Sequence, residues 1–272
     1  MKRLLLSLTV VSTFLLAACQ GNGDGAADLE VLRVGASSTP HSEILEFIAP
    51  MLVEEGIDLQ VTVFQDFVLP NLALHDGELD ANYFQHVPYL TRFNAEQGTD
   101  IVPVGGVHVE PIGIYSSVHD SLDDLPQGAR IIMSNSVSDH GRLLALLQYV
   151  GLITLDPSVV PANSHLEDII DNPLDLQFEA NVDPGMLVQA YRNGEGDAVL
   201  INTNFALDGG LNPMQDAIAM EDSNSPFVNV VAVNAGNEND PRVLALVEAL
   251  HSEAVYQFIL DTYQGAVVPA QQ

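Results

Sequence analysis

The chain has 272 residues, of which 47% are hydrophobic and 17% are charged, and its formal net charge is −29 at pH 7. This composition is apolar enough for a folded core and is not that of a disordered acidic chain. The excess of acid excludes a nucleic-acid partner, because phosphate recognition needs a basic patch. We interpret the acidity as solubility in a saline setting; a calcium-binding surface is the alternative, although no EF-hand loop pattern is present.

The N-terminus has the pattern of a secretory signal peptide. Two basic residues precede an apolar run over residues 4–16, which is too short for a transmembrane helix. We expect residues 1–18 to be the signal peptide and residues 19–31, rich in Gly, Ala and Asp, to be a flexible tether. Loss of the signal peptide removes two positive charges and no acid, so the net charge becomes −31, with six arginines and no lysine left.

Residues 16–19, with the sequence LAAC, resemble the lipobox of bacterial lipoproteins. The resemblance implies that Cys19 is lipidated and becomes the first residue of the mature chain. Two acyl chains suffice for stable anchoring, so we expect a cell-membrane protein held by its lipid and facing the periplasm or the extracellular side. Cys19 is the only cysteine, so no disulfide can form within one chain.

The first half of the remaining chain alternates strand and helix patterns. Pro40 fits the first turn of a helix, and Gly77 and Gly98 fit helix C-termini. Pro111 interrupts an extended stretch over residues 101–116. Strands are predicted at residues 31–37, 57–64 and 77–81, and helices at residues 39–55, 69–77 and 86–98.

The same alternation begins again in the second half. Two α/β units joined by extended segments predict two lobes with a cleft between them, and ligands in such sheets bind at the carboxyl ends of strands. Strands are predicted at residues 129–134, 174–180, 197–201 and 223–233, and helices at residues 139–150, 184–192, 241–250 and 253–263.

Residues 80–90, with the sequence DANYFQHVPYL, concentrate aromatic rings beside amides and an imidazole. Aromatics at this spacing are typical of a core. A plain core, however, would not place Asn82, Gln85 and His86 among its rings. The stretch therefore also fits an apolar slot whose polar groups orient a ligand.

Four segments resemble, in order, landmarks of the NlpA family, the methionine-binding lipoproteins of ABC importers. They are residues 68–90, 106–116, 135–153 and 197–206. The resemblance implies an α/β periplasmic-binding-protein fold with two lobes, two crossover segments and a ligand cleft between the lobes. Lobe 1 would comprise residues 32–116 and 226–272, and lobe 2 residues 117–225. The ligand would be methionine or a close derivative, delivered to a membrane permease with a cytoplasmic ATPase.

The resemblance also implies which residues bind the ligand. A guanidinium suits a carboxylate, and Arg142 at the start of an apolar helix is the candidate; a surface arginine that balances Asp139 is the alternative. A thioether suits aromatic faces, which Phe67, Phe84 and Tyr89 would supply. The polar contacts would come from His86 beside these rings and from three asparagines, Asn82, Asn135 and Asn202. Asn204 fits a helix N-cap instead.

Three departures from the family pattern bear on the ligand. Phe67 stands where a tyrosine is usual, and the loop before Arg142 introduces Asp139 and His140. A glutamine that usually follows Ala180 is missing. Another apolar amino acid or a methionine-containing dipeptide therefore remains an alternative ligand.

Other functional classes have little support in the sequence. No G-x-S-x-G, H-E-x-x-H or glycine-rich phosphate loop is present, so we expect a protein that is not an enzyme and needs no cofactor. The eight histidines lack the spacing of a metal site, although His86, His108 and Glu110 could meet in the fold. A metal-binding solute receptor and a purely structural lipoprotein are the remaining alternatives.

Overall fold

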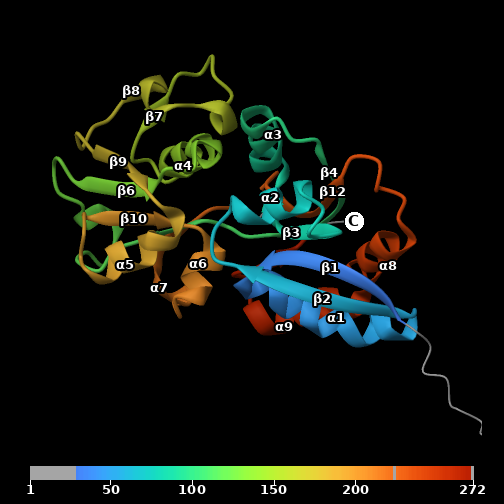
Figure 1. Ribbon diagram of the computed structural model, residues 1–272. Helices are drawn as coiled ribbons and strands as arrows, with labels where there is room; N and C mark the ends of the chain where they lie inside the picture. Colours follow the sequence, from blue (N-terminus) through green and yellow to red (C-terminus); the bar gives the residue numbers. More distant parts are fainter. Residues whose placement is uncertain (1–28, 223–224, 271–272) are drawn as a thin grey trace, which may run out of the picture.

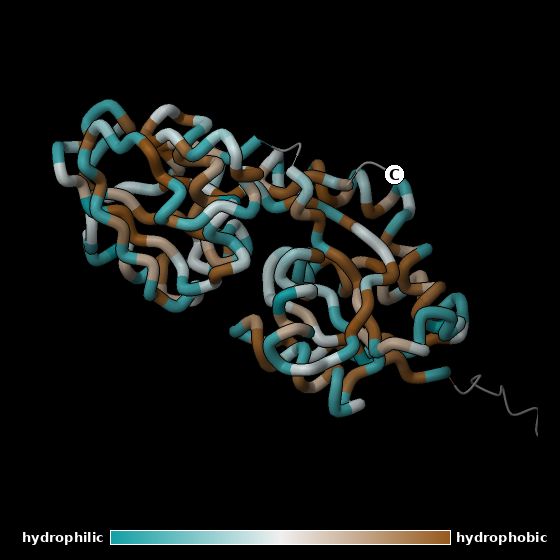
Figure 2. The backbone as a smooth tube through the Cα atoms, turned by 90° about the horizontal axis from the view of Figure 1, so that it is seen from above, coloured by the Kyte–Doolittle hydropathy of each residue, from teal (hydrophilic) through white to brown (hydrophobic). Residues whose placement is uncertain are grey.

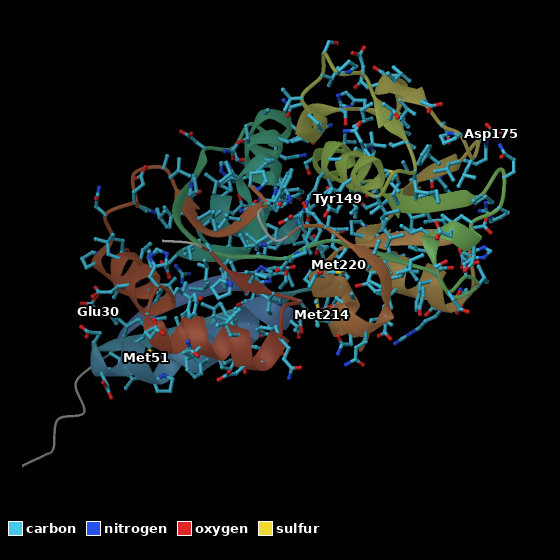
Figure 3. All side chains as sticks on the ribbon, turned by 180° about the vertical axis from the view of Figure 1, so that it is seen from behind. Glu30, Met51, Tyr149, Asp175, Met214 and Met220 are labelled. Atoms are coloured by element: carbon cyan, nitrogen blue, oxygen red, sulfur yellow. The ribbon has the colours of Figure 1, made fainter. Side chains whose placement is uncertain are left out.

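The computed structural model describes residues 29–222 and 225–270. The chain forms two lobes, each built on a mixed sheet with helices packed on its faces (Figure 1). Glu30 and Asp175 mark the two far ends of the molecule (Figure 3). This architecture confirms the predicted two-lobed α/β fold. The signal peptide and Cys19 lie outside the described residues.

The first lobe contains a sheet with the strand order β13-β4-β12-β3-β1-β2. Strands β2, β1 and β3 are parallel, whereas β12 runs antiparallel to both β3 and β4. The carboxyl ends of the three parallel strands therefore meet at one edge of the sheet. The strands are β1 (Glu30–Ser37), β2 (Ile57–Phe64), β3 (Ala81–His86), β4 (Ile101–Val109), β12 (Val228–Asn234) and β13 (Val268–Pro269).

Helices pack on both faces of this sheet. On one face, apolar residues of three helices form the larger core with Leu32, Val34 and Val231. On the other face, Leu74, Leu90 and Phe93 of two helices form a smaller core. The first group is α1 (Glu43–Glu54), α8 (Pro241–Leu250) and α9 (Glu253–Tyr263), and the second is α2 (Leu69–His75) and α3 (Val87–Gln97).

The second lobe contains a sheet with the strand order β11-β5-β10-β6-β9, in which β10, β6 and β9 are parallel. Its strands are β5 (Gly113–Tyr115), β6 (Arg130–Ser134), β9 (Gln177–Val182), β10 (Ala198–Ile201) and β11 (Ala217–Met220). Its helices are α4 (Val137–Tyr149), α5 (Leu187–Arg192), α6 (Thr203–Asp208) and α7 (Pro213–Asp216). A separate hairpin joins β7 (Thr154–Leu155) to β8 (Ile169–Asp171).

Hydrophobic residues gather in the interior of each lobe, whereas many of the outer turns are hydrophilic (Figure 2). In the second lobe, Leu143, Leu144 and Leu147 of α4 pack against Ile131 and its neighbours. Residues of α5 and α6 form a second cluster with Ile132 and Val199, on the opposite face of the same sheet. Each lobe thus has its own core.

Two crossover segments connect the lobes. Residues 110–112 lead from β4 in the first sheet to β5 in the second, and residues 221–227 lead from β11 back to β12. The predicted boundary between the lobes, after residue 116, therefore lies too late in the chain. Strand β5 belongs to the second lobe, because it pairs with β10 and not with a strand of the first sheet. Likewise, β1 begins at Glu30, so the last residues of the predicted tether belong to the fold.

Several predicted elements differ from the observed ones. The predicted strand at residues 77–81 is instead β3, which begins at Ala81, and the aromatic stretch forms the strand itself. The helix predicted from residue 39 begins as α1 at Glu43, after a turn over residues 38–42. The C-terminal helices α8 and α9 have the predicted bounds. Among the described residues no single helix has the length and apolar composition to cross a membrane, although the bent pair α8 and α9 meets that criterion together.

Candidate ligand-binding site

The site is built where parallel strands of both lobes end. His86 is the last residue of β3, Asn135 follows β6, and Asn202 follows β10. Strand ends of this kind expose polar groups that the sheet no longer uses. Because the two sheets present these ends toward the cleft, residues far apart in the sequence line one cavity.

Two adjoining cavities occupy the cleft. The inner cavity, of about 30 Å³, is lined by the aromatic residues Phe67, Phe84 and Tyr89 and by the polar residues Gln85, His86, Glu110, Asp139, Arg142, Asn202, Thr203, Asn204 and Asn229. The outer cavity, of about 240 Å³, shares Phe67 and Tyr89 with it and extends past Asn135 and Arg92. The two shared rings therefore form the wall between the cavities.

Three rings make the apolar side of the inner cavity. The ring centroids of Phe67 lie 6.2 Å from Phe84 and 5.9 Å from Tyr89, and Phe84 lies 6.1 Å from Tyr89. The hydroxyl of Tyr89 donates to the carbonyl of Phe67 at 2.6 Å, which fixes both rings relative to each other. From the second lobe, Phe205 lies 5.0 Å from Phe67 and extends the aromatic wall across the cleft.

Arg142 lies in α4 with its side chain only 4% exposed. Its Nε donates to both carboxylate oxygens of Glu221, at 2.9 and 2.8 Å, and its Nη2 donates to the carbonyl oxygen of Glu110 at 2.6 Å. The guanidinium also lies 4.6 Å from the ring centroid of Phe227. Nη1 has no hydrogen bond to another described residue. Glu221 therefore occupies the Nε side of the guanidinium that was predicted to bind the ligand carboxylate.

Asp139 and His86 join the two lobes inside the cavity. The Nε2 atom of His86 lies 3.0 Å from Oδ1 of Asp139, and Asn202 donates to Oδ2 at 3.2 Å. His86 Nδ1 accepts the N–H of Tyr89, so the proton on this ring lies on Nε2 and is donated to Asp139. Burial alone would raise the pKa of Asp139, but the hydrogen bonds from His86 and Asn202 and the charge of Arg142 hold it below its usual range. Asp139 is therefore an ionised carboxylate in the cleft.

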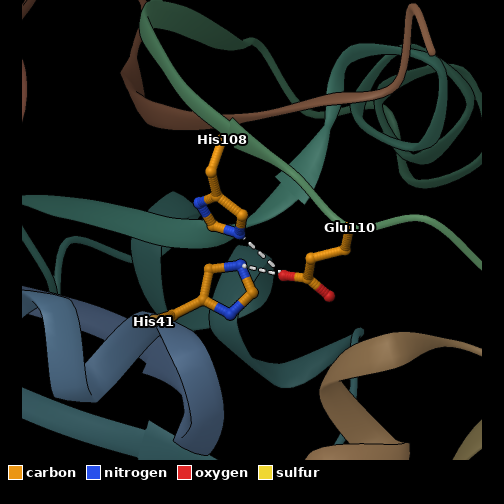
Figure 4. A group of neighbouring side chains, drawn as sticks. All are labelled: His41, His108 and Glu110. Carbon is orange, nitrogen blue, oxygen red and sulfur yellow. Dashed lines mark hydrogen bonds and ion pairs between the residues drawn. The ribbon is translucent and has the colours of Figure 1, made fainter. Parts of the chain in front are cut away.

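Glu110 is held by two buried histidines (Figure 4). His108 Nε2 lies 2.8 Å and His41 Nε2 lies 3.3 Å from the same oxygen, Oε1. The other oxygen accepts the backbone N–H of Asn204 at 3.1 Å. Burial lowers the pKa of His41 to about 4 and that of His108 to about 3, so both rings are neutral. Burial raises the pKa of Glu110, while the charge of Arg142 and the backbone N–H of Asn204 oppose that rise.

The hydrogen bonds of this cluster determine where its protons lie. Tyr83 bonds to Nδ1 of His108, so the neutral ring donates from Nε2 to Glu110. His41 Nδ1 is buried with no partner among the described residues, whereas its Nε2 faces Glu110 and the side-chain oxygen of Asn229. Both histidines therefore donate to acceptors around Glu110 and position its carboxylate.

The same three residues have the spacing of a metal site, since their ligand atoms lie within 4.8 Å of one another. The sequence had suggested His86 with His108 and Glu110; the fold brings His41 to that place and turns His86 toward Asp139. Each facing nitrogen already has an acceptor, so hydrogen bonds account for the cluster without an ion.

Two predicted ligand contacts lie elsewhere. Asn82 lines neither cavity; its amide bonds to Asn71 at 2.8 Å and to Gln85 at 3.0 Å, within a buried amide cluster. Strand β3 also contains a bulge: Val230 pairs with Gln85 and Val231 with Tyr83, so Phe84 is left unpaired. The bulge puts Asn82 and Gln85 on one side of the strand. Asn135 lines only the outer of the two cavities.

Sequence reasoning considered Glu110 only as a metal ligand and assigned no site role to Glu221, Thr203, Asn229 or Phe227. Glu110, Glu221 and Phe227 lie on the crossovers, where neither helical nor strand periodicity gives a signal. Asn229 lies in β12 beside His86, its pairing partner, and Thr203 begins α6. The alternation of β12 gave no reason to single out one asparagine.

Comparison with known proteins gives a consistent result. The family model described as NlpA lipoprotein matches residues 32–271. The methionine-binding lipoprotein MetQ of Bacillus subtilis is 45% identical, over the whole of both chains. A crystal structure of a putative methionine-binding lipoprotein from Bacillus subtilis has a TM-score of 0.87 at 46% identity, covering 89% of this chain and 99% of that one.

A second solved structure bears on the cleft. A nutrient binding protein from Burkholderia cenocepacia, bound to methionine, has a TM-score of 0.82 at 38% identity and covers 88% of this chain and all of that one. The likeness extends over both lobes and both crossovers. The chain therefore belongs to the NlpA lipoprotein family.

Proposed function

We propose that this protein captures methionine or a close derivative outside the cytoplasm and delivers it to the permease of an ABC transporter with a cytoplasmic ATPase. One observation carries the proposal: the inner cavity brings a guanidinium, two carboxylates and three aromatic rings together between the lobes. A free amino acid with a long apolar side chain has the complementary groups. The role is binding and delivery, without catalysis.

The charged groups of the cavity suit the amino acid head group. The Nη1 group of Arg142 would donate to the ligand carboxylate, in charge-assisted hydrogen bonds of about 1.5 to 3 kcal/mol each. Glu110, which the two histidines position, and Asp139 would accept from the ligand ammonium. Asn202 also lines this end of the cavity. A cation and two anions of this kind favour a zwitterion over a ligand with one charge.

The aromatic end of the cavity suits a thioether. Sulfur beside a ring contributes about 0.3 to 1.5 kcal/mol, and each buried methylene about 0.8 kcal/mol. Phe67, Phe84 and Tyr89 all line the inner cavity, whereas Glu221 does not.

The relatives support this ligand. The Bacillus subtilis relative is named a methionine-binding lipoprotein, and the Burkholderia cenocepacia structure contains methionine. Their identities of 45% and 38% extend over both lobes. We accordingly place the protein outside the cytoplasm, anchored to a membrane by a lipid on Cys19. The pattern before Cys19 supports that anchor.

Replacing Phe84 by alanine tests the aromatic slot. We expect methionine affinity to fall by about tenfold, while alanine affinity stays unchanged, because only the longer ligand reaches the ring. Norleucine should bind wild type nearly as well as methionine. Isothermal titration calorimetry with the three ligands measures this, and Phe258→Ala, which removes a ring stacked on Phe47 in the other core face, is the control. A preference for methionine over alanine that survives Phe84→Ala would contradict the slot.

Replacing Cys19 by serine tests the anchor. The variant should carry no lipid and should appear in the soluble fraction or as unprocessed precursor, because serine cannot form the thioether to the acyl-bearing group. Metabolic labelling with a fatty acid and membrane fractionation provide the measurement. Unlabelled Cys19→Ser protein that still partitions with membranes would show that another feature holds the protein there.

The neutral histidines that position Glu110 predict acid sensitivity. In the unfolded chain a histidine titrates near pH 6.5, whereas in the fold His41 titrates at about pH 4 and His108 at about pH 3. Between these limits the unfolded chain binds more protons, so the free energy of unfolding falls as pH falls below 6.5. The loss is on the order of 2 kcal/mol per histidine by pH 4.5. Glu110, with its raised pKa, acts in the opposite direction.

Urea unfolding at pH 7 and at pH 4.5 measures this loss. His108→Gln should be less stable than wild type at pH 7 but should lose less stability between the two pH values. His75→Gln removes an exposed histidine and serves as the control. An equal loss in wild type and His108→Gln would contradict the assignment of His108 as a buried neutral donor.

A further inference from the structure

Glu221 is a partly buried partner of the guanidinium that the proposed ligand would meet. It follows β11, at the start of the second crossover, and it does not line the inner cavity. Its carboxylate accepts from Nε of Arg142 at 2.9 and 2.8 Å. The guanidinium therefore has Glu221 on one side and the cavity on the other.

The same carboxylate is fixed by both crossovers. Oε2 accepts the N–H of Ile112 at 3.1 Å, and Oε1 accepts the hydroxyl of Ser225 at 2.9 Å. The backbone N–H of Glu221 in turn donates to the carbonyl of Ile112 at 2.9 Å. Because Ile112 lies on the first crossover and Ser225 on the second, Glu221 is tied to both connections between the lobes.

The remaining contacts of Arg142 leave one group for a ligand. Nη2 donates to the carbonyl of Glu110 on the first crossover, and the ring of Phe227 lies 4.6 Å from the guanidinium carbon. Nε and Nη2 are thus held by the crossovers, whereas Nη1 has no hydrogen bond to another described residue and Arg142 lines the inner cavity. A guanidinium held in this way has lost its rotamer freedom before a ligand arrives.

We propose that Glu221 is a positioning residue for ligand binding, which holds Arg142 so that its Nη1 group meets the carboxylate of the ligand. This proposal rests on the proposed function. Without Glu221 the buried guanidinium would turn to another acid of the cleft, and Glu110 and Asp139 are the nearest candidates because both line the same cavity. The ligand carboxylate would then lose its contact with the guanidinium, although Arg142 itself is intact.

A competing role for Glu221 would have the opposite effect on ligand affinity, so the sign of the change distinguishes the two roles. A carboxylate beside Arg142 could compete with the ligand for the guanidinium, in which case its removal would strengthen binding. Positioning and competition therefore predict changes of opposite sign. The ligand carboxylate can be removed separately by use of L-methioninamide, whose head group keeps the ammonium and lacks the negative charge.

The experiment compares Glu221→Ala, Glu221→Gln and wild type by calorimetry with L-methionine and L-methioninamide. Glu221→Ala should weaken L-methionine binding by about tenfold or more, the loss of about one charge-assisted hydrogen bond. Its affinity for L-methioninamide should stay that of wild type. Glu221→Gln should fall between, since one amide oxygen can still accept from Arg142. Glu179→Ala, which breaks the exposed salt bridge to Arg130 on the second lobe, is the control and should bind as wild type does.

A double variant completes the test. If Glu221 acts through Arg142, then Arg142→Ala with Glu221→Ala should bind L-methionine no more weakly than Arg142→Ala alone. Unchanged or tighter L-methionine binding by Glu221→Ala would overturn the proposal, and so would an equal loss for both ligands, which indicates a general structural role. Wild-type protein that binds neither ligand would overturn the proposed function itself. The isosteric Glu221→Gln variant keeps the test decisive if Glu221→Ala does not fold.

Discussion

The buried guanidinium of Arg142 is the group around which the cleft is organised. A charge at this depth is tolerated only with partners, and here they come from Glu221, the carbonyl of Glu110 and the ring of Phe227. All three partners lie on the crossovers, whereas Arg142 itself lies on a helix of the second lobe. The need to compensate one charge therefore links the second lobe to the segments that connect it to the first.

The other charged residues of the inner cavity also have partners that compensate their charge. Asp139 lies one turn before Arg142 on α4 and bonds to His86 of the first lobe. The Asp139–His86 hydrogen bond therefore links the two lobes across the cleft. Glu110 supplies its carbonyl to Arg142 and its carboxylate to His41, His108 and the backbone of Asn204. The site thus has paired, buried charges of both signs, which suits a zwitterion more than a neutral ligand.

Much of this arrangement could be predicted from the sequence, and the reasons for success are local. The parallel strands and the ends of α8 and α9 follow from periodicity and from residues such as Pro241 that begin a helix. Phe67, Phe84, His86, Tyr89, Arg142 and Asn202 were selected by their chemistry and by family resemblance, and the fold brings all six to one cavity.

The failures have physical causes that a linear pattern does not carry. Asn82 was expected at the ligand from the family resemblance, but in the fold its amide bonds to Asn71 and Gln85 and it lines neither cavity. Glu221 was missed, and Glu110 was considered only as a metal ligand, because residues on crossovers have no periodicity and their importance depends on a guanidinium far away in the sequence. His41 was missed as a partner of Glu110 for the same reason.

The central claim is that an amino acid lies between the lobes with its side chain among the rings and its carboxylate on Arg142. A crystal structure of the protein with free L-selenomethionine, measured at the selenium absorption edge, tests this most directly, since the protein itself then contains no selenium. The account predicts a single anomalous peak beside Phe67, Phe84 and Tyr89, with the ligand carboxylate within hydrogen-bonding distance of Nη1 of Arg142. An occupied cleft with the selenium directed toward Arg142, or selenium bound only outside the cleft, would contradict it.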